Sequence, residues 1–132
     1  MVKFLVLLGR VFYSAIFIGS GFGHFHWQTI EYAEMHGVPM AEFLVPFSGI
    51  LAILGGISIL LGYKARLGAW LIVIFLVPVT WMMHNFWDVE EPGQRLIQQA
   101  MFMKNLSMLG AALLITYWGA GPYSLCSNKK KK

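Results

Sequence analysis

A chain of 132 residues has room for one domain of ordinary size. Hydrophobic residues make up 58% of it and charged residues 12%, against about 25% charged in a typical soluble domain. This excludes an ordinary soluble fold, which could not bury so much apolar surface, whereas lipid solvates it. The net charge of +4 equals that of the four terminal lysines, Lys129 to Lys132, and such a short run favours anionic lipid over nucleic acid as its partner.

Four apolar stretches predict membrane-spanning helices at about residues 2–25, 43–61, 65–86 and 96–118. Each is near the roughly 20 residues that a helix needs to cross about 30 Å of hydrocarbon. The expected fold is therefore all-α, a bundle of four transmembrane helices in a single domain over residues 1–125. A basic tail at 126–132 follows it. The first stretch runs past Phe22 without a signal-peptide cleavage site, so we expect it to be retained as a span.

The connections between the predicted spans are short. Gly62-Tyr63-Lys64 indicates a tight turn, and Pro92-Gly93 breaks the chain before the last span. Pro78 falls inside the third span and predicts a kink. The longest connection, between Phe25 and Glu42, mixes aromatic and acidic residues, which is typical of a re-entrant or interfacial segment.

The distribution of charge predicts the orientation of the bundle. With four spans, Lys3, Lys64, Arg66 and the terminal lysines all lie on one side, while most of the acidic residues lie on the other. The positive-inside rule then places both termini in the cytoplasm. Small residues predict the helix contacts: Gly9, Ser14, Ala15, Gly19, Ser20, Gly21 and Gly23 in the first span, and Ser48, Gly49, Ala52, Gly55 and Gly56 in the second. Within the first set, Gly19-x-x-x-Gly23 is a pattern that allows close approach of two helix backbones.

Ionisable and amide side chains inside the spans are the candidate site residues, because such groups are costly in lipid. Arg10 lies near the inner end of the first span, where it either reaches toward the interface or binds an internal partner or head group. His24 and His26 end the first span, and His84 and Asn85 end the third, at similar depth. Lys104 and Asn105 lie about nine residues into the fourth span.

These groups allow more than one interpretation. We expect the histidines and Asn85 to serve as polar caps of the span ends or as hydrogen-bonding groups for a ligand. Metal binding by His24, His26 and His84 is the less favoured hypothesis, since no cysteine or second carboxylate completes a ligand set. Lys104 either reaches outward or faces an internal polar site, and His84 and Asn85 are the expected partners of Asn105. Asp88, Glu90 and Glu91 are expected in a solvated loop.

The sequence carries no self-sufficient catalytic motif: it has no nucleotide-binding loop, no catalytic triad and no haem-attachment motif. The single cysteine, Cys126, excludes a thiol relay within the chain. Whether the protein is an enzyme therefore stays open at this stage.

The order of these segments resembles the DoxX family of small four-helix membrane proteins, over nearly the whole chain. The resemblance rests on Arg10, Gly21-Phe22-Gly23-His24, Gly55-Gly56, Leu60-Leu61-Gly62, Ala65-Arg66-Leu67-Gly68-Ala69, His84-Asn85-Phe86-Trp87, Lys104-Asn105-Leu106 and the segment from Gly119 to Leu125. The resemblance implies location in a prokaryotic plasma (inner) membrane and a loose link to membrane redox systems. If the protein is an enzyme, the resemblance implies a subunit of a quinone-linked oxidoreductase. Family members often carry a glutamate shortly before the Gly-Gly pair, and Ala52 stands there, which argues against autonomous catalysis.

The leading hypothesis is an accessory protein of a membrane redox system. It would bind a quinone or lipid-like ligand between the first, third and fourth spans, in the outer half of the bundle. The residues expected to line the polar end of that site are His24, His84, Asn85, Lys104 and Asn105. Donors such as an imidazole N–H or the lysine ammonium would bind a quinone carbonyl. Alternatively, the chain is a non-catalytic scaffold. Its small-residue faces would then bind a redox partner subunit or further copies of the same chain.

Overall fold

The computed structural model describes residues 1–126, so of the tail predicted at 126–132 only Cys126 is described and Lys129 to Lys132 lie outside. Its helices are α1 (Val2–Gly23), α2 (Trp27–Met35), α3 (Ala41–Leu61), α4 (Ala65–Met83) and α5 (Pro92–Trp118), with a 3-10 turn, η1 (Phe86–Asp88), before α5. Residues 1–126 contain no β-strand, which confirms the all-α class.

Four of the helices are long and apolar enough to cross a membrane: α1, α3, α5, and α4 continued through η1. With its 21 residues, α3 rises about 30 Å, the thickness of the hydrocarbon layer. α5 begins at Pro92 rather than at residue 96, because the Glu91 side chain caps the helix and proline suits its first position. α4 continues through Pro78 and ends at Met83.

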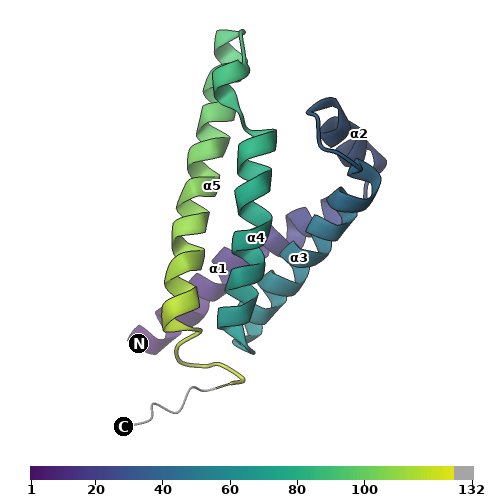
Figure 1. Ribbon diagram of the computed structural model, residues 1–132. Coiled ribbons are helices and arrows are strands. Elements are labelled where there is room, and N and C mark those ends of the chain that lie inside the picture. Colours follow the sequence, from purple (N-terminus) through teal and green to yellow (C-terminus); the bar gives the residue numbers. More distant parts are fainter. Residues whose placement is uncertain (127–132) are drawn as a thin grey trace.

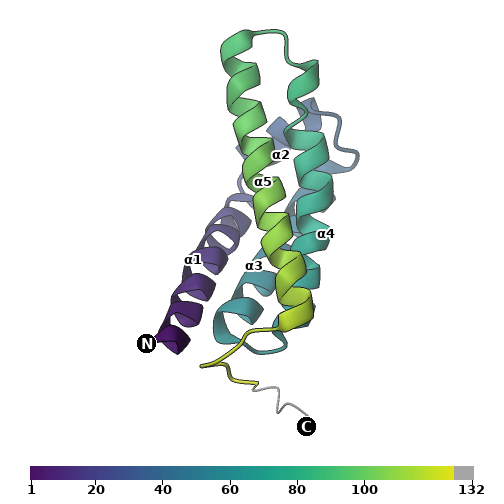
Figure 2. The ribbon, with the colours of Figure 1, turned by 90° about the vertical axis from the view of Figure 1, so that its left-hand side faces the viewer.

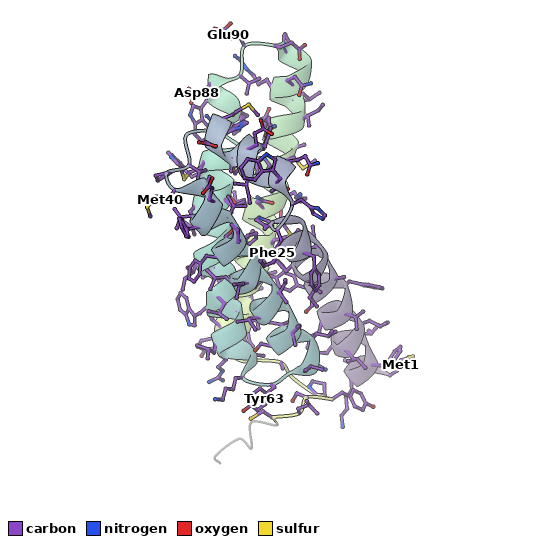
Figure 3. The ribbon with its side chains drawn as sticks, turned by 90° about the vertical axis from the view of Figure 1, so that its right-hand side faces the viewer. Met1, Phe25, Met40, Tyr63, Asp88 and Glu90 are labelled. Atoms are coloured by element: carbon purple, nitrogen blue, oxygen red, sulfur yellow. The ribbon has the colours of Figure 1, made fainter. Side chains whose placement is uncertain are left out.

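The spans pack in chain order, α1 against α3, α3 against α4 and α4 against α5, while α2 lies over α3 (Figure 1). The N-terminus and the chain that follows α5 lie at one end of the bundle, and the α4–α5 hairpin extends past α2 at the other (Figures 1 and 2). Figure 3 shows Met1 and Tyr63 at the first of these ends, here called the terminal end, and Asp88 and Glu90 at the second, the loop end.

The core of the bundle is built from alanine, aliphatic and phenylalanine side chains of all four spans. The buried members of this cluster are Phe17, Ala52, Ile59, Ala69, Ile72, Phe75, Leu76 and Ala112. Alanine at the contact positions lets the helix backbones approach closely, which is how helices associate where lipid removes the hydrophobic driving force.

Two pairs of glycines set the closest contacts between spans. A Cβ atom added to Gly49 of α3 would lie 2.7 Å from the Gly21 carbonyl oxygen of α1. One added to Gly55 would lie 2.8 Å from the Gly68 carbonyl oxygen of α4. Cβ atoms essentially never come that close to a backbone oxygen, so these positions allow the helix contacts only as glycine.

The predicted contact through Gly19-x-x-x-Gly23 is wrong. A Cβ atom at Gly19 or Gly23 would meet no other side chain and no other helix within 4 Å among the described residues. The buried residues of α1 are Arg10, Ser14, Phe17 and Gly21, which recur every three or four positions and form the stripe that faces α3. At about 100° of rotation per residue, Gly19 and Gly23 point well away from that stripe.

The long connection between the first two spans forms the helix α2. Its residues Ile30 and Ala33 are buried against Ala41 and Val45 of α3, in a second, smaller hydrophobic cluster. α2 has nine residues and is therefore far too short to span the membrane. It covers the end of α3 near the loop end of the bundle.

Candidate ligand-binding cavity

A partly open cavity of about 390 Å³ lies beside α2, bordered by α2, α3 and α4 and by the residue that follows α1. This volume is within the range of about 300–1,000 Å³ that small-molecule sites occupy. Its apolar lining consists of Ala33, Val38, Pro39, Leu44, Val45, Phe47, Leu51, Ile74, Phe75, Pro78, Val79, Met82 and Met83, and its polar lining of His24, Thr29 and Ser48. The arrangement suits a mostly apolar molecule with a small polar group.

The turn between α1 and α2 brings α2 over the cavity. The Thr29 hydroxyl donates to the Gly23 carbonyl at 2.9 Å and so ties the first turn of α2 to the last turn of α1. The buried contacts of Ile30 and Ala33 then hold α2 against α3. α2, which forms the roof of the cavity, is therefore attached both to the end of α1 and to α3.

His24, half-buried, is the ionisable residue among those that line the cavity. Its Nδ1 atom lies 2.7 Å from the Ser20 carbonyl oxygen, one turn earlier in α1. The imidazole ring packs edge-on against the Phe75 ring of α4, with centroids 5.5 Å apart and planes at 70°. Both contacts fix the ring, so its position at the cavity wall is set by the Ser20 carbonyl of α1 and by the Phe75 ring of α4.

Ser48 is the polar residue that α3 contributes to the wall. Its hydroxyl donates to the Val45 carbonyl at 2.7 Å within the same helix. A buried or half-buried hydroxyl satisfied in this way leaves its oxygen lone pairs for another partner.

The structure pairs His84 and Asn85 with neighbours other than Asn105. The Nδ1 atom of His84 lies 2.8 Å from Oε1 of Gln98 on α5. The Asn85 amide donates to Oδ2 of Asp88 at 3.0 Å. Both residues lie past the end of α4, and the cavity lining includes neither. Among the described residues these contacts hold the connection between α4 and α5 together. Asp88, predicted in a solvated loop, therefore also accepts a hydrogen bond within that connection.

Lys104 and Asn105 are adjacent in α5 but face different environments. Lys104 is exposed, and its ammonium donates to the sulfur of Met101 at 3.3 Å. Asn105 is 4% exposed and points into the bundle. Lys104 therefore reaches outward, one of its two predicted orientations, whereas Asn105 faces the interior of the bundle. Neither residue lines the cavity.

Arg10 is buried at the terminal end of the bundle, far along α1 from His24. Its side chain is 5% exposed, and Nη2 donates to the carbonyl oxygen of Tyr123 in the segment that follows α5. Of the expected alternatives, it therefore binds an internal partner. Its place on α1 separates it from the cavity by about 14 residues of helix, or roughly 20 Å.

The three histidines considered as metal ligands do not converge. Within residues 1–126, no group of three or more histidine, cysteine or acidic side chains is placed to hold a metal ion. His26 is exposed, His24 faces the cavity, and His84 contacts Gln98.

Of the residues singled out in the sequence, the structure places His24 alone at the cavity. Sequence reasoning missed Thr29, Ser48 and the wall formed by Met82 and Met83. Thr29 lies in the first turn of α2, where a threonine hydroxyl commonly bonds to a nearby backbone group. The other contributions depend on how α3 and α4 are rotated about their axes, for which single residues carry no signal.

Two proteins with similar sequences are named as inner membrane proteins. Inner membrane protein YqjF of Escherichia coli is 32% identical over 130 residues, covering 96% of this chain and 93% of that protein. Inner membrane protein YphA of the same organism is 30% identical, covering 92% and 87%. The ER-derived vesicles protein ERV29 of Saccharomyces cerevisiae is 30% identical over 84 residues, covering 64% of this chain and 27% of that protein. No solved structure gives a significant match.

The sequence profile of the DoxX family matches residues 5–85, which span α1 to α4 and therefore include the cavity and its α2 roof. The two bacterial relatives align over nearly their full length, which extends the similarity through α5. On this evidence the chain is an integral membrane protein that belongs to the DoxX family.

Proposed function

We propose that this protein binds a lipid-like molecule with a single hydrocarbon chain in the cavity between α2, α3 and α4. The observation that carries the proposal is the lining of the cavity, which is apolar apart from His24, Thr29 and Ser48. In that space a hydrocarbon chain contacts apolar side chains, and a small head group reaches the three polar residues.

The size of the cavity supports one chain rather than a two-chain phospholipid. A methylene group takes up about the volume of a water molecule, roughly 30 Å³, so 390 Å³ holds on the order of a dozen carbons. Flexible Met82 and Met83 side chains at the wall adapt to chains of different shape.

Isoprenoid quinones of the membrane are ligands of this kind, and the family resemblance favours them. With a quinone or quinol bound, the protein would serve as an accessory to a bacterial inner-membrane redox system. The polar end of the site then consists of His24, Thr29 and Ser48 rather than of the five residues expected from the sequence.

Native mass spectrometry of the detergent-purified protein tests this proposal, with extraction and identification of any retained molecule. We expect one small lipid-like molecule per chain. Ser48→Phe fills the cavity and should release it, whereas Ile50→Phe, on an exposed position of the same helix, should retain it. Lys104→Ala and His84→Ala lie outside the cavity and should also retain it.

Two results would contradict the proposal. One is a wild-type protein that carries only bulk phospholipid. The other is equal retention by Ser48→Phe and Ile50→Phe when both variants keep the helical content and thermal unfolding temperature of the wild type.

A further inference from the structure

The hydroxyl groups at the cavity wall have already donated their hydrogens. Each of Thr29 and Ser48 has one hydroxyl hydrogen. Thr29 gives it to the Gly23 carbonyl at 2.9 Å and Ser48 gives it to the Val45 carbonyl at 2.7 Å. What each hydroxyl still offers to a ligand is a lone pair on oxygen, which accepts a hydrogen bond.

The hydrogen bond of His24 determines which of its ring nitrogens carries the proton. Nδ1 lies 2.7 Å from the Ser20 carbonyl oxygen, and a carbonyl oxygen only accepts. Nδ1 therefore holds the hydrogen, and in the neutral ring Nε2 is left with a lone pair. Only one ring carbon separates Nε2 from Nδ1, and the bond to Ser20 does not use Nε2. Because His24 lines the cavity, Nε2 is the ring atom that can accept a hydrogen bond from a ligand there.

Pro78 adds an acceptor on the α4 side of the cavity. Proline has no N–H group, so the carbonyl of Ile74, four residues earlier in α4, lacks its usual helical donor. Both Ile74 and Pro78 line the cavity. The remaining side chains of the lining are hydrocarbon or thioether and bring no donor.

We infer that the ligand's head group is a hydrogen-bond donor, an alcohol or a phenol such as a hydroquinone, and not a carbonyl. A hydroxyl finds acceptors at His24 Nε2, Thr29 and Ser48, whereas a carbonyl finds no free donor among these side chains and stays unpaired in an apolar space, which is costly. The inference rests on the proposed function and reverses the sequence-based expectation that an imidazole N–H would bind a quinone carbonyl.

A matched pair of probes tests the polarity of the site: farnesol, a C15 isoprenoid alcohol, and farnesyl methyl ether, which has the same chain and no donor. Each competes with tritiated farnesol for the wild-type protein in lipid nanodiscs. We expect the alcohol to bind about tenfold more tightly than the ether, the typical effect of one hydrogen bond in an apolar site. A short-chain hydroquinone, kept reduced, should likewise bind more tightly than its quinone.

Variants of His24 assign the preference to Nε2. Asparagine can place an N–H where Nδ1 stands and has no atom at the Nε2 position, so His24→Asn should bring the alcohol and the ether to nearly equal affinity. Glutamine reaches the Nε2 position, so His24→Gln should keep most of the preference. His36→Asn is the control, because His36 Nδ1 makes the same bond to a carbonyl one turn earlier, with Tyr32 at 2.8 Å, outside the cavity.

The outcomes separate this inference from the proposed function. Equal affinity of the alcohol and the ether for the wild type, or tighter binding of the quinone, overturns the donor inference and leaves the cavity as a binding site. Failure of every probe to bind overturns the proposed function itself. The comparison of probes on the wild type does not depend on the folding of any variant. Identification of the molecule extracted from the native protein distinguishes an isoprenoid alcohol from a hydroquinone.

Discussion

Gly49 shows how single residues set the spacing of the spans. Its Cα approaches α1 so closely that an added Cβ would lie 2.7 Å from both the Gly21 carbonyl oxygen and the Cβ atom of His24. The same contact therefore positions His24, whose ring forms part of the cavity wall. Both the packing of α1 on α3 and the geometry of the candidate site therefore depend on the lack of a side chain at Gly49.

Replacement of Gly49 by alanine should destabilise the bundle. The extra methyl group forces α1 away from α3, and overpacking of this kind costs about 1–3 kcal/mol. Gly19→Ala is the matched control, because its methyl group meets open space; it should not lower the stability, since alanine is favoured over glycine inside a helix by roughly 0.5–1 kcal/mol. Thermal unfolding in detergent measures both, and equal unfolding temperatures would contradict this account of the contact.

Glu91 caps α5 with its side chain. Its carboxylate accepts hydrogen bonds from the backbone N–H groups of Gly93 and Gln94, and these bonds hold the pKa of Glu91 below its usual range. Because the folded-state pKa is depressed, the stabilisation is present above the usual glutamate pKa and is lost as the pH falls through the folded-state value.

Glu91→Gln should therefore loosen the first turn of α5 at neutral pH and make little difference in acid, where the wild-type carboxylate is protonated too. Amide hydrogen exchange over residues 93–96 measures the effect, with Glu90→Gln as the neighbouring control. A difference between wild type and Glu91→Gln that stays constant as the pH falls would show that the charge of the cap is unimportant.

At the scale of elements, the segment that follows α5 turns back across the terminal end of the bundle. The backbone N–H of Leu125 donates to the Leu61 carbonyl at 3.1 Å, and that of Cys126 donates to the Gly62 carbonyl at 3.2 Å. Arg10 of α1 donates to Tyr123 in the same segment. The segment thus joins α1 to the turn between α3 and α4.

Loss of the Arg10 side chain should release this segment. The exposed Cys126 is the one cysteine of the sequence, so a nitroxide spin label attached there reports its mobility. Arg10→Leu should sharpen the spectrum, because the hydrogen bond to Tyr123 is lost. Lys3→Leu, an exposed cation on the same helix, should leave the spectrum unchanged. Identical spectra for wild type and Arg10→Leu would mean that the Leu125 and Cys126 bonds alone hold the segment.

At the scale of the whole molecule, an even number of spans puts both chain ends on the same face of the membrane. Lys3, Lys64 and Arg66 lie at the terminal end, whereas Asp88, Glu90 and Glu91 lie at the loop end. This asymmetry of charge predicts that the terminal end faces the cytoplasm.

The orientation is measurable with the native cysteine. A membrane-impermeant maleimide should label Cys126 in inside-out vesicles and not in intact bacterial cells. In a Cys126→Ser background, Glu90→Cys at the loop end should show the opposite pattern. Labelling of Cys126 in intact cells would reverse the predicted orientation without affecting the fold.

The four-span architecture could be predicted from the sequence because hydrophobic length is a local property. A run of about 20 apolar residues must be a helix in lipid, where every backbone group needs an internal partner. Charges flanking such runs and turn residues such as Gly62 are equally local. The helix bounds accordingly lie within a few residues of the predicted ones, apart from the earlier start of α5 at its Glu91 cap.

The rotation of each helix could not be predicted in this way. Spans that are apolar all round carry little periodicity to show which face is buried. Small residues therefore indicated the contacts without separating Gly21 and Gly49, which make one, from Gly19 and Gly23, which do not. Lys104 and Asn105 are neighbours in the sequence, yet about 100° of helix rotation separates them, which leaves one exposed and the other buried.

By itself the sequence determined that this protein is an all-helical membrane bundle with four spans, and its family follows from that order of segments. The tertiary structure alone decided where the cavity lies, because its lining comes from α2, α3, α4 and the loops beside α2, which converge only when α2 folds over α3. It also decided the chemistry of the site, since the donor hydrogens of His24, Thr29 and Ser48 are committed by backbone geometry that composition does not encode.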